Sequence, residues 1–250
     1  RANHQVSLIG LLLVLMVSNA ASAQETPPAT RIEPPQSVLF LGNSLTMYNN
    51  AIYTHLRGLL VAVDPAAREQ VFLKSIMING AVLEDHRGGL MQMLDTRDWD
   101  VVVLQGHSRE VLDENMAESF TSTAREFARV IRSKGSEPVL FMTWAYADQP
   151  GMTARLAEAY AKLGGELELR VVPVGLAFEQ AGKDIPGLSL YVPDGIHQTI
   201  EGTNLAASVF YAALIGASPV DIDYDAGLDA GLARQLRGVA WRTVRKYISQ

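Results

Sequence analysis

The sequence predicts an α/β fold in which a mainly five-stranded parallel sheet lies between two layers of helices. Short runs of large apolar residues alternate with longer segments whose apolar residues recur every three or four positions. The short runs are apolar throughout, as expected for strands that are covered on both faces. No linker-like segment interrupts residues 37–250, so we expect this range to be one domain.

The first half of the domain contains three of the expected strands. The run at 37–41 (SVLFL) predicts a buried strand, and the apolar spacing over 48–63 predicts a helix after it. A second strand is expected over 71–78. The clearest strand signal is 100–105 (DVVVLQ), and 116–134 has one apolar face typical of a helix.

The second half continues the alternation. The run PVLFMT predicts a fourth strand and RVVPV a fifth, with helices before and after the latter. An Ala-rich helix and a last helix with an apolar stripe complete the domain. The expected strands here are 138–143 and 170–174, and the expected helices are 152–167, 200–214 and 228–250. A further helix is expected after the fifth strand, through Phe178 to about Lys183.

The N-terminal segment has the pattern of a secretory signal peptide. Residues 6–17 (VSLIGLLLVLMV) form an apolar run that is short for a membrane span, and Ala21-Ser22-Ala23 resembles a cleavage site. A Pro-rich linker follows over 24–36. We therefore expect cleavage after residue 23, a periplasmic or secreted protein, and no stable membrane anchor afterwards.

Composition excludes several functional classes. The 250 residues include no cysteine, which removes disulfides, thiolate metal sites and cysteine nucleophiles. Lys and Arg total 21 against 27 Asp and Glu, a net charge of −6 that argues against nucleic acid as a partner. Neither a metal-ligand spacing nor a dinucleotide or phosphate-binding motif is present, so we expect no cofactor.

The first candidate site follows the first expected strand. Ser44 in Gly42-Asn43-Ser44 can occupy a tight turn into a helix, with its hydroxyl exposed near backbone N–H groups. The same residues also suit an ordinary helix N-cap. Thr46 stands where the α/β-hydrolase elbow has its second glycine, so that fold is not indicated.

The second candidate site is Asp194-Gly195-Ile196-His197, near the C-terminus. Side chains three positions apart can meet, and a carboxylate can then hold an imidazole in the tautomer that accepts a proton from serine. A solvated loop pair is the alternative. Because the carboxyl ends of parallel strands share one edge of a sheet, Ser44 and His197 can meet despite their separation.

Together these motifs resemble the SGNH (GDSL-type) hydrolase superfamily over the whole domain, in an uncharacterised bacterial branch. The resemblance implies a three-layer α/β/α sandwich with a flavodoxin-like sheet. It also implies a triad of Ser44, Asp194 and His197, and an oxyanion hole that includes the N–H groups of Ser44 and Gly80. The expected activity is that of a serine esterase.

This sequence departs from the third block of the family, which usually reads G-x-N-D. Here the chain reads Gln105-Gly106-His107-Ser108, with Ser108 in the place of the Asn. Gln105-Gly106 resembles the Q-G-E variant of carbohydrate-esterase branches. We expect the Gln105 amide, or else the Ser108 hydroxyl, to complete the oxyanion hole. The alternative is that Gln105 only holds a loop in place.

The resulting hypothesis is hydrolysis of a small acyl ester through an acyl-enzyme, with O-acetylated carbohydrate as the preferred substrate class. A lipase or thioesterase of the same superfamily is one alternative. A non-catalytic binding domain on a hydrolase scaffold is another, motivated by the altered third block. Asn43, His107 and Trp144 are weaker candidates for lining the substrate cleft. The oligomeric state is left open.

Overall fold

The computed structural model describes residues 34–249, so the expected signal peptide and most of the linker lie outside the described residues. Five parallel strands form one sheet in the order β2-β1-β3-β4-β5. This is the flavodoxin-like order, in which β2 pairs with one edge of β1 and β3 pairs with the other edge. The strands are β1 (Ser37–Gly42), β2 (Phe72–Met77), β3 (Val101–Leu104), β4 (Glu137–Phe141) and β5 (Arg170–Val172).

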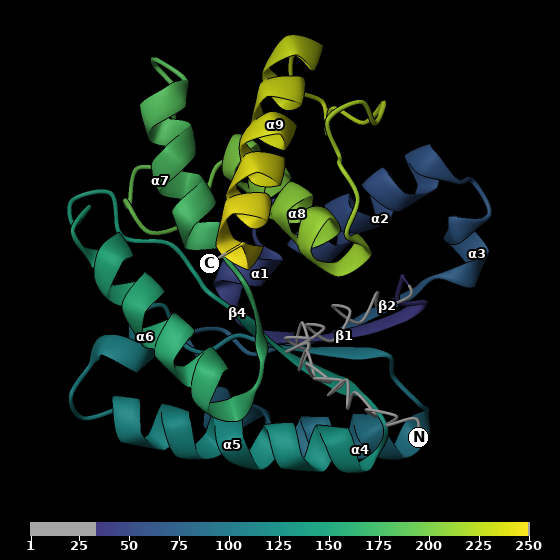
Figure 1. Cartoon of the computed structure of the whole chain (residues 1–250), viewed down its shortest axis with the longest axis vertical. Helices are drawn as coiled ribbons and strands as arrows, with labels where there is room; N and C mark the ends of the chain where they lie inside the picture. The colour runs from purple at the N-terminus through teal and green to yellow at the C-terminus, as the bar shows by residue number, and fades with distance from the viewer. Residues whose placement is uncertain (1–33, 250) are drawn as a thin grey trace, which may run out of the picture. The chain divides into compact units, whose positions relative to one another are not determined.

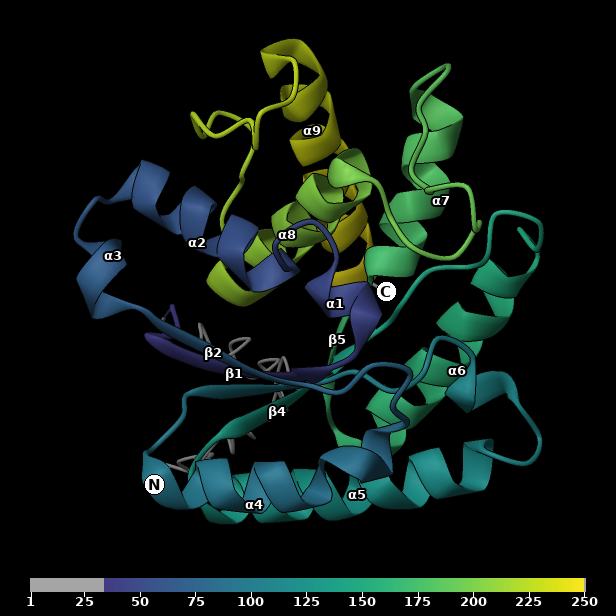
Figure 2. The same cartoon turned by 180° about the vertical axis from the view of Figure 1, so that it is seen from behind.

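Helices cover both faces of the sheet (Figures 1 and 2). Side chains alternate along β1: Val38 and Phe40 pack into one apolar core, while Leu39 and Leu41 pack into the other. This alternation confirms the three-layer α/β/α architecture. The first core is closed by α2 (Ile52–Val63), α7 (Val174–Asp184), α8 (Ile200–Ile215) and α9 (Ala230–Ile248), and the second by α4 (Arg87–Thr96), α5 (Ala117–Ser133) and α6 (Met152–Leu167).

The Ala-rich α8 is the most enclosed helix. All its residues from Gly202 to Leu214 are buried, because α8 packs against α2 and α9 as well as the first core. A helix buried all round has no need of an amphipathic pattern. None of the helices that the structure describes combines the length and apolarity needed to cross a membrane.

The main differences from the sequence expectations lie between residues 44 and 112. The segment expected to be helical from residue 48 begins its helix only at Ile52, because Asn49, Asn50 and Ala51 all have positive φ. The helix α4 was not expected from the sequence. The remaining short elements are α1 (Ser44–Met47), α3 (Ala67–Gln70) and the 3₁₀ turns η1 (Leu83–His86) and η2 (Glu110–Leu112).

Candidate active site

Ser44 is the first residue of the short helix α1, and only Asn43 separates it from the end of β1. Asn43 caps this helix, since its side-chain oxygen accepts a hydrogen bond from the Leu45 N–H at 3.1 Å. The turn needs glycine at position 42, where a Cβ would lie 2.5 Å from Gln105 Oε1 and 2.8 Å from Thr46 Oγ1. Crowding at Gly42 and the cap at Asn43 together fix the direction in which Ser44 leaves the sheet.

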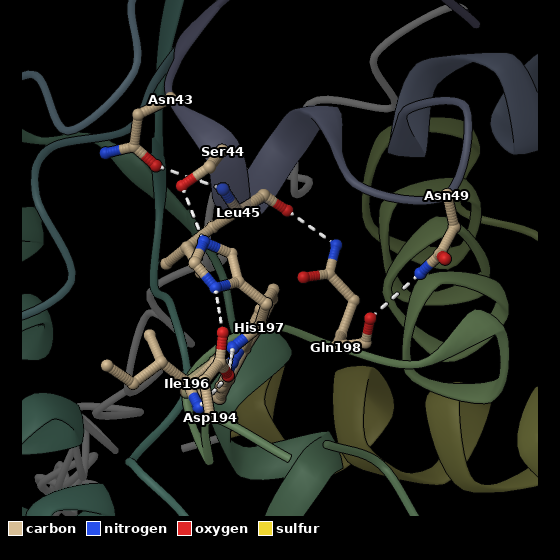
Figure 3. Close-up of polar contacts among 9 residues, drawn as sticks. Asn43, Ser44, Leu45, Asn49, Asp194, Ile196, His197 and Gln198 are labelled. Atoms are coloured by element: carbon tan, nitrogen blue, oxygen red, sulfur yellow. Dashed lines mark hydrogen bonds and ion pairs between the residues drawn. The ribbon is translucent and has the colours of Figure 1, made fainter. Parts of the chain in front are cut away.

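His197 bridges Ser44 and Asp194 (Figure 3). The imidazole Nε2 lies 2.8 Å from Ser44 Oγ, and Nδ1 lies 2.6 Å from Asp194 Oδ2. The second carboxylate oxygen of Asp194 accepts hydrogen bonds from the N–H groups of Ile196 and His197. With Nδ1 donating to the carboxylate, Nε2 is free to accept the serine proton.

The charge state of Asp194 suits this arrangement. Partial burial raises the pKa of Asp194, but hydrogen bonds from the Ile196 N–H and from His197 outweigh burial, so the net pKa is lowered. The carboxylate is 41% exposed and the imidazole 23% exposed, so both remain within reach of solvent. An ionised Asp194 can then stabilise an imidazolium that forms during catalysis.

Hydrogen bonds from three side chains anchor the loop that holds Asp194 and His197. Gln198 Nε2 donates to the Leu45 carbonyl at 2.8 Å, which ties this loop directly to α1, and Asn49 Nδ2 donates to the Gln198 carbonyl at 2.9 Å (Figure 3). The Trp144 indole N–H donates to the Ile196 carbonyl at 2.9 Å. These contacts fix the spacing between the serine and the histidine.

Trp144 does not line a cleft, contrary to expectation. Its side chain is 1% exposed and stacks on Phe178 with 4.3 Å between ring centroids. Because the ring lies within the apolar core beneath the loop, only its N–H reaches toward the site. Trp144 therefore supports the loop of His197 rather than contacting a substrate.

Gln105 and Asn43 also differ from expectation. Gln105 is fully buried, and its two amide hydrogens are committed to Asn43 Oδ1 at 2.6 Å and the Gly106 carbonyl at 3.0 Å. Its oxygen accepts from the Asn43 N–H and from Thr46 Oγ1. Gln105 therefore has no free donor for an oxyanion, and the loop-holding alternative describes it. Asn43 is 2% exposed within the same network and does not line a cleft.

Ser108 and His107 are the two remaining candidates from the third block. Ser108 Oγ lies 2.6 Å from the Tyr146 hydroxyl, and neither Ser108 nor His107 is hydrogen-bonded to Ser44 or His197. The His107 Nδ1 atom is buried without a hydrogen-bond partner in the described residues. Burial, and then the positive charge of Arg109, lower the pKa of His107, which favours a neutral ring.

Gly80, which is expected to donate to an oxyanion, has a left-handed backbone conformation and open space beside it. Its φ is +68°, and no atom lies within 4 Å of the place where a Cβ would stand. Within residues 34–249, the N–H groups of Gly80 and Ser44 donate no hydrogen bond. An oxyanion hole formed by these two donors stays a prediction from the resemblance.

Sequence reasoning missed two residues of this region. Tyr48 stacks on the His197 imidazole, with 4.4 Å between ring centroids and 17° between the planes. Glu110 is a carboxylate that is only 1% exposed and binds backbone N–H groups of two loops. Nothing in the local pattern marks either residue, because each contact joins segments that are distant in sequence or depends on the turn after α1.

Within residues 34–249, no three His, Asp or Glu side chains converge in a way that could hold a metal ion. The serine, histidine and carboxylate described above form a hydrogen-bonded row, which is suited to nucleophilic chemistry at the serine.

Comparison with known proteins gives structural neighbours only. No family model and no curated protein sequence matches the chain. A protein from Slackia heliotrinireducens, provisionally described as an SGNH hydrolase, is 26% identical with a TM-score of 0.59 over 70% of this chain and 97% of that one. A DUF4886 family protein from Bacteroides uniformis is 20% identical, with a TM-score of 0.67 over 83% of this chain and 94% of that one.

A third neighbour is a characterised enzyme. A catalytic mutant of Axe2, an acetylxylan esterase from Geobacillus stearothermophilus, is 15% identical with a TM-score of 0.59 over 76% of this chain and 98% of that one. The neighbours include SGNH and GDSL-type hydrolases, and the chain shares their fold. The resemblance to that superfamily noted in the sequence is confirmed.

Proposed function

We propose that this protein is a serine ester hydrolase of the SGNH type. The observation that carries the proposal is the continuous row from Ser44 Oγ through the His197 imidazole to the Asp194 carboxylate. This is the arrangement that turns a weakly nucleophilic hydroxyl into an effective one. The SGNH-type neighbours, one of which is described as an acetylxylan esterase, support this reaction class.

The reaction begins with acylation of Ser44. Its oxygen attacks the ester carbonyl carbon while its proton passes to His197 Nε2, and the carbonyl oxygen becomes an oxyanion facing the N–H groups of Ser44 and Gly80. The C–O bond to the alcohol then breaks, and the alcohol leaves with the proton from His197. A water molecule, deprotonated by His197, releases the acid and restores Ser44.

The preferred substrate class is a small acyl ester, with O-acetylated carbohydrate as the leading candidate. Gln105-Gly106 supports this choice through its resemblance to carbohydrate-esterase branches. A structural neighbour described as an acetylxylan esterase supports it further, and catalytic mutants of that enzyme replace a serine or a histidine by alanine. The N-terminal signal pattern favours action outside the cytoplasm.

The decisive experiment compares Ser44→Ala with the unchanged enzyme on a panel of esters. The panel runs from acetyl to long-chain acyl groups and from aryl to sugar alcohols. We expect acetyl esters to be cleaved best and Ser44→Ala to lose several orders of magnitude in kcat while staying folded. Ser122→Ala, on the exposed side of α5, is the matched control.

Three results would redirect the proposal. Full activity of Ser44→Ala would overturn the serine mechanism. A preference for long acyl chains would favour the lipase or thioesterase alternative. Failure of a fluorophosphonate probe to label folded protein at Ser44 would favour a binding domain without catalysis.

A further inference from the structure

A buried carboxylate joins the two loops that follow β2 and β3. Glu110, in the 3₁₀ turn η2, is 1% exposed. Its Oε2 accepts hydrogen bonds from the His107 N–H at 2.8 Å and from the Leu83 N–H at 3.0 Å. Leu83 lies three residues after Gly80, and His107 lies two residues after Gln105, so one oxygen atom links both loops.

The space between Glu110 Oε2 and the backbone of Gly106 is too small for a side chain at position 106. A Cβ at position 106 would lie 2.5 Å from Glu110 Oε2 and 2.7 Å from the Phe120 ring, so glycine is required there. Asn43 Nδ2 makes a second tie between the same loops, donating to the Ala81 carbonyl at 3.1 Å and to the Gly106 carbonyl at 3.3 Å.

The segment around Gly80 is thus held on both sides. Before it, the Ile78 N–H donates to the Gly42 carbonyl at 3.0 Å. After it, Ala81 and Leu83 are held by Asn43 and Glu110. Gly80 itself has open space beside it and a free N–H. The position of that N–H is therefore set by its neighbours.

A carboxylate is a costly choice for this tie. Burial raises the pKa of Glu110, hydrogen bonds from His107 and Leu83 lower it, and the charges of Asp85 and Glu84 raise it again, with a net increase. Since the environment disfavours the charge, what the site needs from Glu110 is an oxygen acceptor at one defined point. Apolar side chains could fill the space but would leave two N–H groups unpaired.

We propose that Glu110 is a positioning residue that holds the Gly80 N–H where it meets the oxyanion formed at Ser44. The proposal rests on the proposed function, because an oxyanion forms only if Ser44 is acylated. Glu110 acts through geometry: its Oε2 fixes the loop after β2 against the loop after β3, and both loops contact Asn43, the residue before the serine.

The experiment compares Glu110→Gln with Glu110→Asp. Gln keeps one oxygen that can take the place of Oε2 and accept from both N–H groups. Asp keeps the charge but is one methylene shorter, so it cannot reach both loops. Glu114→Gln, an exposed change four residues away, is the matched control. For each variant we measure kcat and KM on an acetyl ester, the rate of labelling by a fluorophosphonate, and thermal unfolding.

We expect Glu110→Gln and Glu114→Gln to keep kcat within about threefold of the unchanged enzyme, because the acceptor oxygen is retained or remote. We expect Glu110→Asp to lose about 10- to 100-fold in kcat with little change in KM, somewhat less than removal of a whole oxyanion donor. Labelling should slow in parallel, because the phosphoryl oxygen of the probe needs the same N–H groups.

Any other order of the two variants overturns the proposal. If Asp retains kcat and Gln loses it, the charge and not the reach of the side chain matters. If both keep kcat and labelling rate, or lose them equally, at a temperature where both are folded, Glu110 has only a structural role. Activity in Ser44→Ala would instead refute the proposed function, which makes the two failures distinguishable.

Discussion

The Tyr48 ring lies almost parallel to the His197 imidazole, with 4.4 Å between the ring centroids. Tyr48 follows α1 directly and remains 38% exposed, so one of its faces covers the imidazole while the residue still meets solvent. The same short segment thus carries Ser44 at its start and, at its end, a ring that restrains the partner of Ser44.

Replacing Tyr48 by Ala should lower kcat/KM by about two- to tenfold, because an aromatic contact of this kind contributes about 0.5–1.5 kcal/mol. Tyr48→Phe keeps the ring and should stay close to the unchanged enzyme. Steady-state kinetics on an acetyl ester measures the difference. Equal rates for the Ala and Phe variants would show that the stacking does not orient His197.

Asp194→Asn should reduce kcat by roughly 10³–10⁴-fold without unfolding the protein. The amide can present an N–H to Nδ1, which favours the tautomer that carries its proton on Nε2 and cannot accept from Ser44. Because the pKa of Asp194 is lowered, the unchanged carboxylate gives its support at neutral pH and loses it only as acid protonates it. Asp98→Asn, exposed beside the amino end of β3, should be silent.

Trp144→Phe tests whether Trp144 is a core residue, as its burial indicates, or a cleft residue, as the sequence predicted. The variant loses the hydrogen bond to the Ile196 carbonyl, and we expect the free energy of unfolding to fall by about 1–3 kcal/mol while KM changes little. Urea unfolding and substrate titration measure the two quantities. Trp241→Phe on the partly exposed face of α9 is the control. A severalfold rise in KM with unchanged stability would restore the cleft interpretation.

Gln105→Leu should destabilise the fold strongly. It leaves the Asn43 N–H and the Thr46 hydroxyl without their acceptor, and each buried group left unpaired costs about 1–3 kcal/mol. Chemical unfolding should therefore show the loss first, with activity falling because the turn that carries Ser44 is no longer held. A variant as stable as the unchanged protein, yet slow to form the acyl-enzyme, would contradict this and support a direct oxyanion contact.

The sequence alone was sufficient for the sheet, because its strands are short apolar runs that stay apolar on both faces. The contact between Asp194 and His197 could also be predicted from the sequence, since three residues of separation allow a local contact. The sequence could not give the direction of the Gln105 amide, which depends on Asn43 and Thr46, about 60 residues away. Nor could it reveal α4, where Gly88 and Gly89 obscure the helical pattern.

Ser44 and His197 are 153 positions apart, yet their side chains meet at 2.8 Å. A ribosome releases the serine long before it releases the histidine, since chains emerge from the N-terminal end. Hydrolysis is therefore impossible for a nascent chain until at least residue 197 has emerged. A nick between the two positions that lets the halves separate would silence it again. On the proposed mechanism, turnover of an ester therefore reports that the chain has been made at least through residue 197 and has closed.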